Sequence, residues 1–213
     1  MSKSIIIMGE SGSGKTTAMR NLNPETTFYI DCDKKGLNWK GWKEQYNKNK
    51  KNYVATSDPK AIVTLLNKIN TEYTKFNVVV IDTINWIMVD EEFKRMKEKN
   101  YDKWMDLAFS IYDIASMSNN LRDDLTIILV AHSQTERDES GYYFTRVKTS
   151  GRKLEKIVIE SKVSTVLLAK CVDGKYIFET KNDNSTVKSP LGAFTTDKID
   201  NDIVKVLEAL KEY

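Results

Sequence analysis

The chain has 213 residues, of which 33 are Lys or Arg and 30 are Asp or Glu, so its formal net charge is +3. Hydrophobic residues make up 40% and charged residues 30% of the chain, which is typical of a soluble globular protein and excludes a disordered or fibrous one. No apolar run is long enough to cross a membrane, and the first apolar strand begins too early to leave room for a signal peptide. Cys32 and Cys171 are far apart, which favours a reduced, cytoplasmic protein, and we expect a single domain over residues 1–213.

A phosphate-binding loop follows the first predicted strand, residues 4–8. Its spacing is G-x-x-x-x-G-K-T, in which the glycines allow successive backbone N–H groups to face a phosphate. Lys15 would reach the β- and γ-phosphates, and the Thr16 hydroxyl would ligate Mg²⁺. A helix over residues 16–22, ended by Asn23-Pro24, would add the positive end of its dipole. The residues expected to contact a nucleoside triphosphate are Gly9, Glu10, Ser11, Gly12, Ser13, Gly14, Lys15, Thr16 and Thr17.

A second strand is predicted at residues 27–31, and a segment rich in lysine and aromatic residues, 34–53, follows it. That segment could form a second nucleic-acid surface, but local packing of Trp39 and Trp42 with solvated lysines is the interpretation that we favour. Ser57-Asp58-Pro59 is typical of a helix start, and the apolar residues after it recur with helical period.

The next predicted strand, residues 78–82, consists of four apolar residues and Asp82. Such a strand is typical of a parallel sheet buried on both faces, and an Asp at its carboxyl end would lie beside the phosphate loop and help to hold Mg²⁺. Two helices, 84–99 and 102–121, lead to a strand at 126–131. A polar loop over 133–151, a short helix over 152–161, a hairpin of strands 163–171 and 176–180, and a closing helix over 201–213 complete the chain. This order predicts an α/β three-layer P-loop NTPase fold, mostly parallel, with antiparallel strands at the C-terminal end.

The order of these motifs resembles that of the RecA-like ATPases. The segments that carry the resemblance are residues 28–33, the Asp82 strand, residues 129–134 and the late hairpin followed by Lys181-Asn182. The resemblance extends from Ser4 to about Asn184, and the compact size points to the small phage-encoded RecA-like proteins implicated in single-strand annealing recombination. It implies ATP and Mg²⁺ as cofactors, a homo-oligomer, and in a phage infection the host cytoplasm as location.

The resemblance also implies roles for particular residues besides Lys15. Asp33 falls where the family has an acidic residue that orients or deprotonates the attacking water, although Asp33 could also be an ordinary solvated loop residue. His132 and Gln134 fall where the family senses the γ-phosphate, and a structural role is the alternative for a lone histidine. Lys181 matches a basic residue that family members insert into the ATP site of a neighbouring subunit, and a solvated loop lysine is the alternative.

The polar loop after residue 131 would face single-stranded DNA in a RecA-like protein. Its second half combines three adjacent aromatic residues with basic ones, a composition suited to base stacking and phosphate neutralisation. The alternative is a β-hairpin whose aromatic side chains pack on the body of the protein. The residues expected to contact DNA are Tyr142, Tyr143, Arg146, Lys148, Arg152 and Lys153.

These observations favour an ATPase that assembles on single-stranded DNA and promotes annealing or strand pairing, with a single-strand-binding protein as a possible partner. One alternative is a nucleotide-gated interaction module in replication or recombination, without DNA contact. A small-molecule phosphotransferase is the least favoured, because the arginine-rich lid of such enzymes has no counterpart in this sequence. A GTPase is set aside because Lys181-Asn182-Asp183 is a poor match to a guanine-reading motif.

Overall fold

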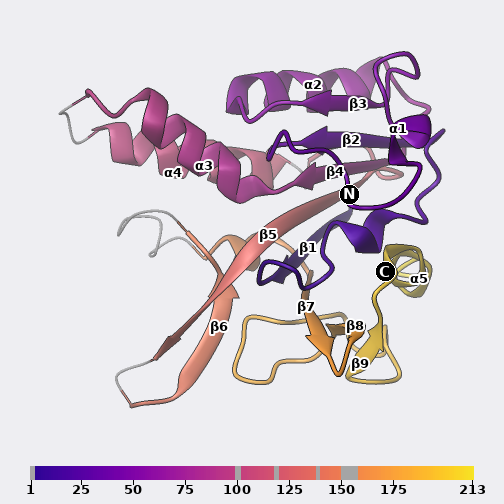
Figure 1. Ribbon diagram of the computed structural model, residues 1–213, viewed down its shortest axis with the longest axis vertical. Helices are drawn as coiled ribbons and strands as arrows, with labels where there is room; N and C mark the ends of the chain where they lie inside the picture. The colour runs from indigo at the N-terminus through magenta and orange to yellow at the C-terminus, as the bar shows by residue number, and fades with distance from the viewer. Residues whose placement is uncertain (1–2, 99–101, 118–119, 138–139, 150–157) are drawn as a thin grey trace.

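A computed structural model of the protein describes residues 3–98, 102–117, 120–137, 140–149 and 158–213. Within these residues nine strands form one sheet in the order β3-β2-β4-β5-β1-β7-β8-β9, with β6 paired to β5 outside that path (Figure 1). The strands are β1 (Lys3–Gly9), β2 (Thr27–Asp31), β3 (Tyr53–Ala55), β4 (Val78–Asp82), β5 (Thr126–Arg137), β6 (Tyr143–Val147), β7 (Thr165–Val172), β8 (Lys175–Glu179) and β9 (Lys198–Asp200). The helices are η1 (Thr17–Met19), α1 (Trp42–Gln45), α2 (Pro59–Thr71), α3 (Ile84–Lys94), α4 (Asp102–Met117), η3 (Ile159–Lys162) and α5 (Ile203–Ala209).

The centre of the sheet is parallel and its C-terminal part is antiparallel. Strands β3, β2, β4, β5, β1 and β7 pair in parallel, whereas β8 and β9 pair antiparallel beside β7. The predicted α/β fold, mostly parallel with antiparallel strands near the C-terminus, is therefore confirmed. Because parallel strands end at a common edge, Asp31 lies in register with Asp82, and Gly9 with His132.

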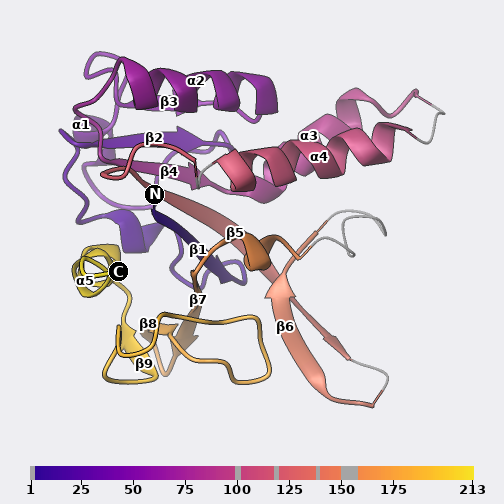
Figure 2. The ribbon, with the colours of Figure 1, turned by 180° about the vertical axis from the view of Figure 1, so that it is seen from behind.

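Two hydrophobic cores, one on each face of the sheet, give the molecule three layers. Alternation along β1 sends Ile6 and Met8 to one core, with α2, α3 and α4, and sends Ile5 and Ile7 to the other, with η1 and α5. Figure 2 shows the same arrangement from behind. Helix α2 begins as predicted, since the Asp58 carboxylate accepts hydrogen bonds from the N–H groups of Lys60 and Ala61.

The segment rich in lysine and aromatic residues packs against the second core. Tyr46 is fully buried, and its ring centroid lies 5.5 Å from that of Tyr29 and 6.2 Å from that of Trp39. Trp42 packs at an angle on Tyr53, with 5.5 Å between ring centroids. The local packing that we favoured for these aromatic residues is therefore what the structure shows.

Three segments differ from the expectation. The helix expected over residues 16–22 is only the 3-10 turn η1, because the N–H groups of Met19, Arg20 and Leu22 bond to carbonyls three residues earlier instead of four. The polar segment 133–151 is largely the β-hairpin that was the alternative to a loop, since β5 continues to Arg137 and pairs with β6, although Tyr142 and Tyr143 are exposed instead of packed on the body. The helix expected over 152–161 falls mostly outside the described residues, and its described end is the short turn η3.

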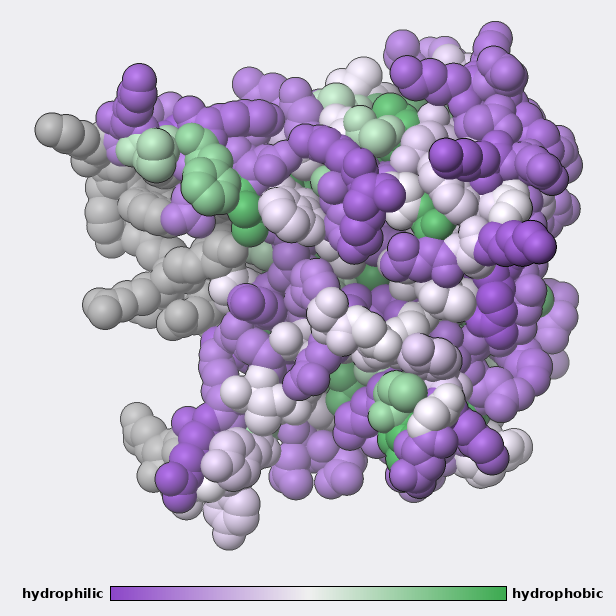
Figure 3. Space-filling model, in the orientation of Figure 1, coloured by the Kyte–Doolittle hydropathy of each residue, from purple (hydrophilic) through white to green (hydrophobic). Residues whose placement is uncertain are grey.

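The face of the molecule that is seen in Figure 3 is predominantly polar. Figure 3 shows a mostly hydrophilic face on which hydrophobic residues form small, separate areas. In the part of the chain that the structure describes, none of the helices combines the length and apolar character needed to cross a bilayer.

Candidate functional site

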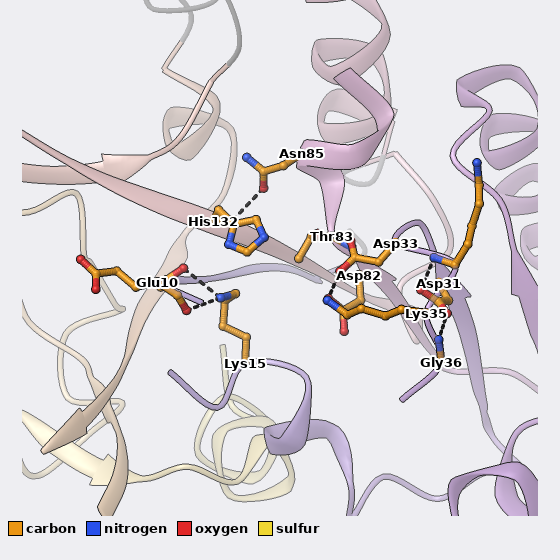
Figure 4. Close-up of polar contacts among 12 residues, drawn as sticks. Glu10, Lys15, Asp31, Asp33, Lys35, Gly36, Asp82, Thr83, Asn85 and His132 are labelled. Carbon is orange, nitrogen blue, oxygen red and sulfur yellow. Dashed lines mark hydrogen bonds and ion pairs between the residues drawn. The ribbon is translucent and has the colours of Figure 1, made fainter. Parts of the chain in front are cut away.

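The phosphate loop joins β1 to η1 and has the backbone that its glycines predict. Gly12 and Gly14 have φ angles of 80° and 89°, in the left-handed region that favours glycine. The Lys15 ammonium turns back on the loop and donates hydrogen bonds to the carbonyls of Gly9, at 2.9 Å, and Glu10, at 2.6 Å (Figure 4). Burial lowers the pKa of Lys15 to about 8, and the nearby Asp82 carboxylate opposes that effect. The loop therefore holds a buried cation at the place where an anionic ligand is expected.

Asp82 ends β4 beside the phosphate loop, as the sequence predicted. The Tyr29 hydroxyl donates to Asp82 Oδ2 over 2.6 Å, whereas the buried Oδ1 has no hydrogen-bond partner among the described residues. Burial raises the pKa of Asp82 to about 6, although the Tyr29 and Thr16 hydroxyls act in the opposite direction. A buried carboxylate oxygen next to a threonine hydroxyl fits the oxygen ligands that Mg²⁺ prefers. Asp82 and Thr16 are thus suited to hold the metal of a nucleotide–Mg²⁺ complex.

The loop after β2 brings Asp33 to the same edge of the sheet. The Asp31 carboxylate folds this loop, because it accepts hydrogen bonds from the N–H groups of Lys34, at 2.9 Å, and Gly36, at 2.8 Å. Asp33 Oδ1 then accepts from the Thr83 hydroxyl over 2.5 Å, and Asp33 Oδ2 pairs with the Lys35 ammonium. The Asp33 side chain is only 2% exposed. Asp33 is therefore next to the Asp82 strand end, but Thr83 and Lys35 already engage its carboxylate.

His132 is held at the edge by Asn85 from α3. Asn85 Oδ1 accepts from the backbone N–H of His132 over 2.7 Å (Figure 4). Asn85 Nδ2 donates to the Lys148 carbonyl over 2.7 Å. Burial lowers the pKa of the His132 imidazole, and the positive charge of Lys15 lowers it further. His132 is therefore a neutral imidazole at pH 7, able to donate or accept one hydrogen bond.

A pocket of about 270 Å³ lies along the phosphate loop. We call it the nucleotide pocket. Its lining residues are Ser11, Gly12, Gly14, Lys15, Thr16, Thr17, Lys35, Asn38, Thr83, His132 and Tyr176. Sequence reasoning missed Lys35, Asn38, Thr83 and Tyr176. Lys35, two residues after Asp33, had the one available signal, since it follows a strand that ends at the same edge of the sheet.

Two predicted site residues lie elsewhere. Gln134 is beyond the sheet on the extended part of β5 and hydrogen-bonds to Glu136, so it does not line the nucleotide pocket. Lys181 is exposed and forms an ion pair with Asp197 at 2.6 Å. The Lys181 side chain is therefore exposed and does not line the nucleotide pocket.

Comparison with known proteins identifies the family. The sequence profile of an AAA domain family matches residues 1–188. The chain belongs to this AAA domain family. None of the curated proteins matches the chain. Among solved structures, the AAA domain resembles the KaiC-like protein PH0186 from the hyperthermophilic archaeon Pyrococcus horikoshii OT3, with a TM-score of 0.50 and 11% sequence identity over 83% of this chain and 77% of that one. At this identity the likeness shows the fold alone, a RecA- and KaiC-like P-loop fold.

This AAA domain is a P-loop ATPase domain, a family that typically binds ATP with Mg²⁺.

The four residues predicted for DNA contact that the structure describes are all on or beside β6. Tyr142 and Tyr143 are 69% and 66% exposed, whereas Arg146 pairs with Glu136 at 3.1 Å. Lys148 follows β6 directly, next to His132. Arg152 and Lys153 lie outside the described residues.

Proposed function

We propose that this AAA domain is an ATP-hydrolysing protein that contacts single-stranded DNA through the hairpin of β5 and β6 and acts in annealing or strand pairing. The observation that carries the proposal is the exposure of three adjacent aromatic residues at the end of this hairpin. Tyr142, Tyr143 and Phe144 are 69%, 66% and 38% exposed. Aromatic side chains of this size usually pack against the rest of the protein instead. The hairpin stands away from the sheet (Figure 1).

The hairpin has the chemistry of a stacking platform. A hollow of about 390 Å³ is lined by its three aromatic residues together with Glu136, Arg137 and Asn184. Bases of single strands stack on aromatic side chains regardless of sequence, and arginine adds attraction to phosphate. Glu136 reduces the positive charge of this surface, because it pairs with Arg146. We therefore expect contact dominated by stacking, with a modest dependence on salt.

One β-strand, β5, connects the hairpin to the nucleotide pocket. His132 lines the pocket, and β5 continues from it to Arg137 without a break. The Lys148 N–H donates to the His132 carbonyl over 2.7 Å, which ties the end of β6 to the same residue. A change at His132 on nucleotide binding would therefore reach both strands of the hairpin.

Hydrolysis would use the charged groups around the pocket. Lys15 would neutralise the β- and γ-phosphates, Thr16 and Asp82 would hold Mg²⁺, and His132 would contact the γ-phosphate. Asp33 would orient the attacking water once Lys35 turns from it toward the phosphates. Lys181 would serve the ATP site of the next subunit in a homo-oligomer, in exchange for its present partner Asp197.

A nucleotide-gated interaction module is the second candidate, and one observation favours it. The Asp33 carboxylate is only 2% exposed and is paired with Lys35, which leaves the water-activating group engaged. In that case hydrolysis is slow, and the hairpin aromatics bind another protein, such as a single-strand-binding protein, instead of DNA. The two candidates differ in whether DNA stimulates ATP hydrolysis.

The test is the steady-state rate of ATP hydrolysis with and without a single-stranded oligonucleotide, alongside fluorescence anisotropy of the labelled oligonucleotide. Lys15→Ala serves as the blank. The double variant Tyr142→Ala/Tyr143→Ala should bind the oligonucleotide at least about tenfold more weakly, since each stacked base contributes about 1–3 kcal/mol. Tyr73→Ala is the matched control, because Tyr73 is an exposed tyrosine, 43% accessible, at the end of α2 and away from the hairpin.

A DNA-stimulated rate that is lost in Lys15→Ala, with weaker DNA binding in the double variant alone, would support the proposal. A measurable ATPase that is indifferent to DNA, together with no binding of the oligonucleotide at low salt, would refute the DNA role and favour the interaction module. Equal loss of binding in the double variant and in Tyr73→Ala would show that the hairpin has no special part in binding.

A further inference from the structure

The nucleotide pocket has an aromatic wall that the phosphate-binding residues do not explain. Tyr176 on β8 lines the pocket and is 49% exposed. Its ring lies against the phosphate loop, since a Cβ built on Gly14 would come within 2.7 Å of Tyr176 Cδ1. The phenol ring thus packs against the loop backbone, while about half of the Tyr176 surface stays exposed.

The position of Tyr176 separates it from the groups that handle the phosphates. In the sheet, β4 and β5 lie on one side of β1, and β7 and β8 lie on the other. Thr83 and His132 therefore approach the phosphate loop from the first side, and Tyr176 from the second. A ligand whose terminal phosphate lies near His132 would extend its other end toward Tyr176.

A buried amide without partners lies beside the same ring. Asn201 is 5% exposed, and neither Oδ1 nor Nδ2 has a hydrogen-bond partner among the described residues. Asn201 Oδ1 lies 3.3 Å from the point that a Cβ on Gly14 would occupy, so the amide is directed at the phosphate loop. Burying an amide without partners is unfavourable, and a ligand that supplied them would recover that free energy.

The backbone around Asn201 is fixed to the segment that follows the phosphate loop. Arg20 Nη1 donates to the carbonyls of Thr17 and Asn201, each at 3.0 Å. The Asn21 side chain donates to the Asp202 carboxylate over 2.7 Å. These contacts hold the backbone of Asn201 close to that of Thr17, and Thr17 borders the nucleotide pocket.

We propose that Tyr176 and Asn201 form the nucleoside subsite of this protein. The base stacks on the open face of the Tyr176 ring, and the Asn201 amide, which offers one acceptor and one donor group, hydrogen-bonds to the polar edge of the base after a small movement of the ring from Gly14. This inference rests on nucleotide binding at the phosphate loop, and it assigns the recognition of the base to the antiparallel, C-terminal part of the sheet.

The test is isothermal titration of the full chain with Mg²⁺–ATP and, separately, with Mg²⁺–tripolyphosphate, which has the phosphates and no base. Tyr176→Ala and Asn201→Ala should each weaken ATP binding by about tenfold and leave tripolyphosphate binding within about twofold. Tyr176→Phe keeps the ring and should bind ATP like the parent. Tyr73→Ala is the control for loss of an exposed tyrosine, and thermal melts verify that every variant is folded.

Each outcome supports or overturns the nucleoside subsite, or overturns the proposed function. Selective loss of ATP binding in both alanine variants, with retention in Tyr176→Phe, would establish the subsite. Unchanged ATP binding in the alanine variants would overturn the subsite alone, while the phosphate loop would keep its role. Equal weakening of ATP and tripolyphosphate would also overturn it, because these residues would then only shape the loop. A parent protein that binds neither compound would overturn the proposed function itself.

Discussion

Replacing Asp82 by asparagine should make the ligand-free protein more stable. The carboxyl of Asp82 has its pKa raised to about 6 by burial, from an ordinary value of 3.8. Between these two pH values the folded state binds more protons than the unfolded state, so the free energy of unfolding falls as the pH rises through that window. The pKa difference corresponds to about 3 kcal/mol of destabilisation at neutral pH. Asp82→Asn removes the buried charge and keeps an oxygen to accept from Tyr29.

The assay is urea denaturation without nucleotide at pH 7.5 and at pH 5, followed by intrinsic fluorescence. Asp82→Asn should raise the free energy of unfolding by about 3 kcal/mol at pH 7.5 and by clearly less at pH 5, where the parent Asp82 is largely protonated. Magnesium-dependent binding of ATP should be lost in the same variant. If the substitution stabilises the fold and abolishes ligand binding, then Asp82 is a binding-site residue that lowers the free energy of unfolding.

Asp31→Asn is the matched control, since Asp31 is in register with Asp82 on the neighbouring strand. Its carboxylate accepts from two backbone N–H groups and from the Tyr53 hydroxyl, so an amide nitrogen there would face a donor. We expect a destabilisation of about 1–3 kcal/mol. If Asp82→Asn were destabilising at pH 7.5, or if its effect did not depend on pH, the reasoning from the cost of burying the Asp82 charge would be refuted.

Three further predictions concern the same edge of the sheet. Magnesium-dependent ATP affinity should fall as the pH drops through about 6, because protonated Asp82 cannot serve as a metal ligand; titration calorimetry from pH 8 to pH 5 would detect it, and a flat profile would contradict it. Asn85→Ala should cost about 1–3 kcal/mol in urea denaturation, since it removes the partner of two partly buried backbone groups, the His132 N–H and the Lys148 carbonyl; an unchanged midpoint would count against this. Gly14→Ala should lower the free energy of unfolding by about 1 kcal/mol or more, because alanine disfavours the positive φ, and it should reduce the affinity for ATP. Parent-like values of both quantities would show that the phosphate loop accommodates alanine.

The parts of the fold that the sequence predicted depend on local pattern. The phosphate loop, the strand of Asp82 and the capped start of α2 each combine a short apolar run with a particular polar or glycine residue at its end. Such signals need no knowledge of distant contacts. The parallel order followed from strands alternating with helices, and the antiparallel end followed from the turn at Asp173-Gly174, where both residues have positive φ.

The parts that the sequence did not predict depend on contacts between distant segments. Nothing near Tyr176 in the sequence shows that tertiary packing brings it to the phosphate loop. The extension of β5 was missed for a different reason, since residues 132–137 are polar and lack the alternation of a half-buried strand. A two-stranded ribbon that buries neither face leaves no such pattern. For Lys181 the sequence suggests a role between subunits, which a single chain does not test.

The strand β5 changes its surroundings at one residue. Up to His132 its backbone lies between β4 and β1, and from Ser133 onward its only strand partner in the described chain is β6. Isolated two-stranded ribbons are marginally stable in water, whereas central strands open only with the whole domain. Amide hydrogens of residues 127–131 should therefore exchange with deuterium on the timescale of global unfolding, and those of 133–137 much faster. Within one continuous strand, the boundary between slow and fast exchange falls at the histidine that borders the nucleotide pocket.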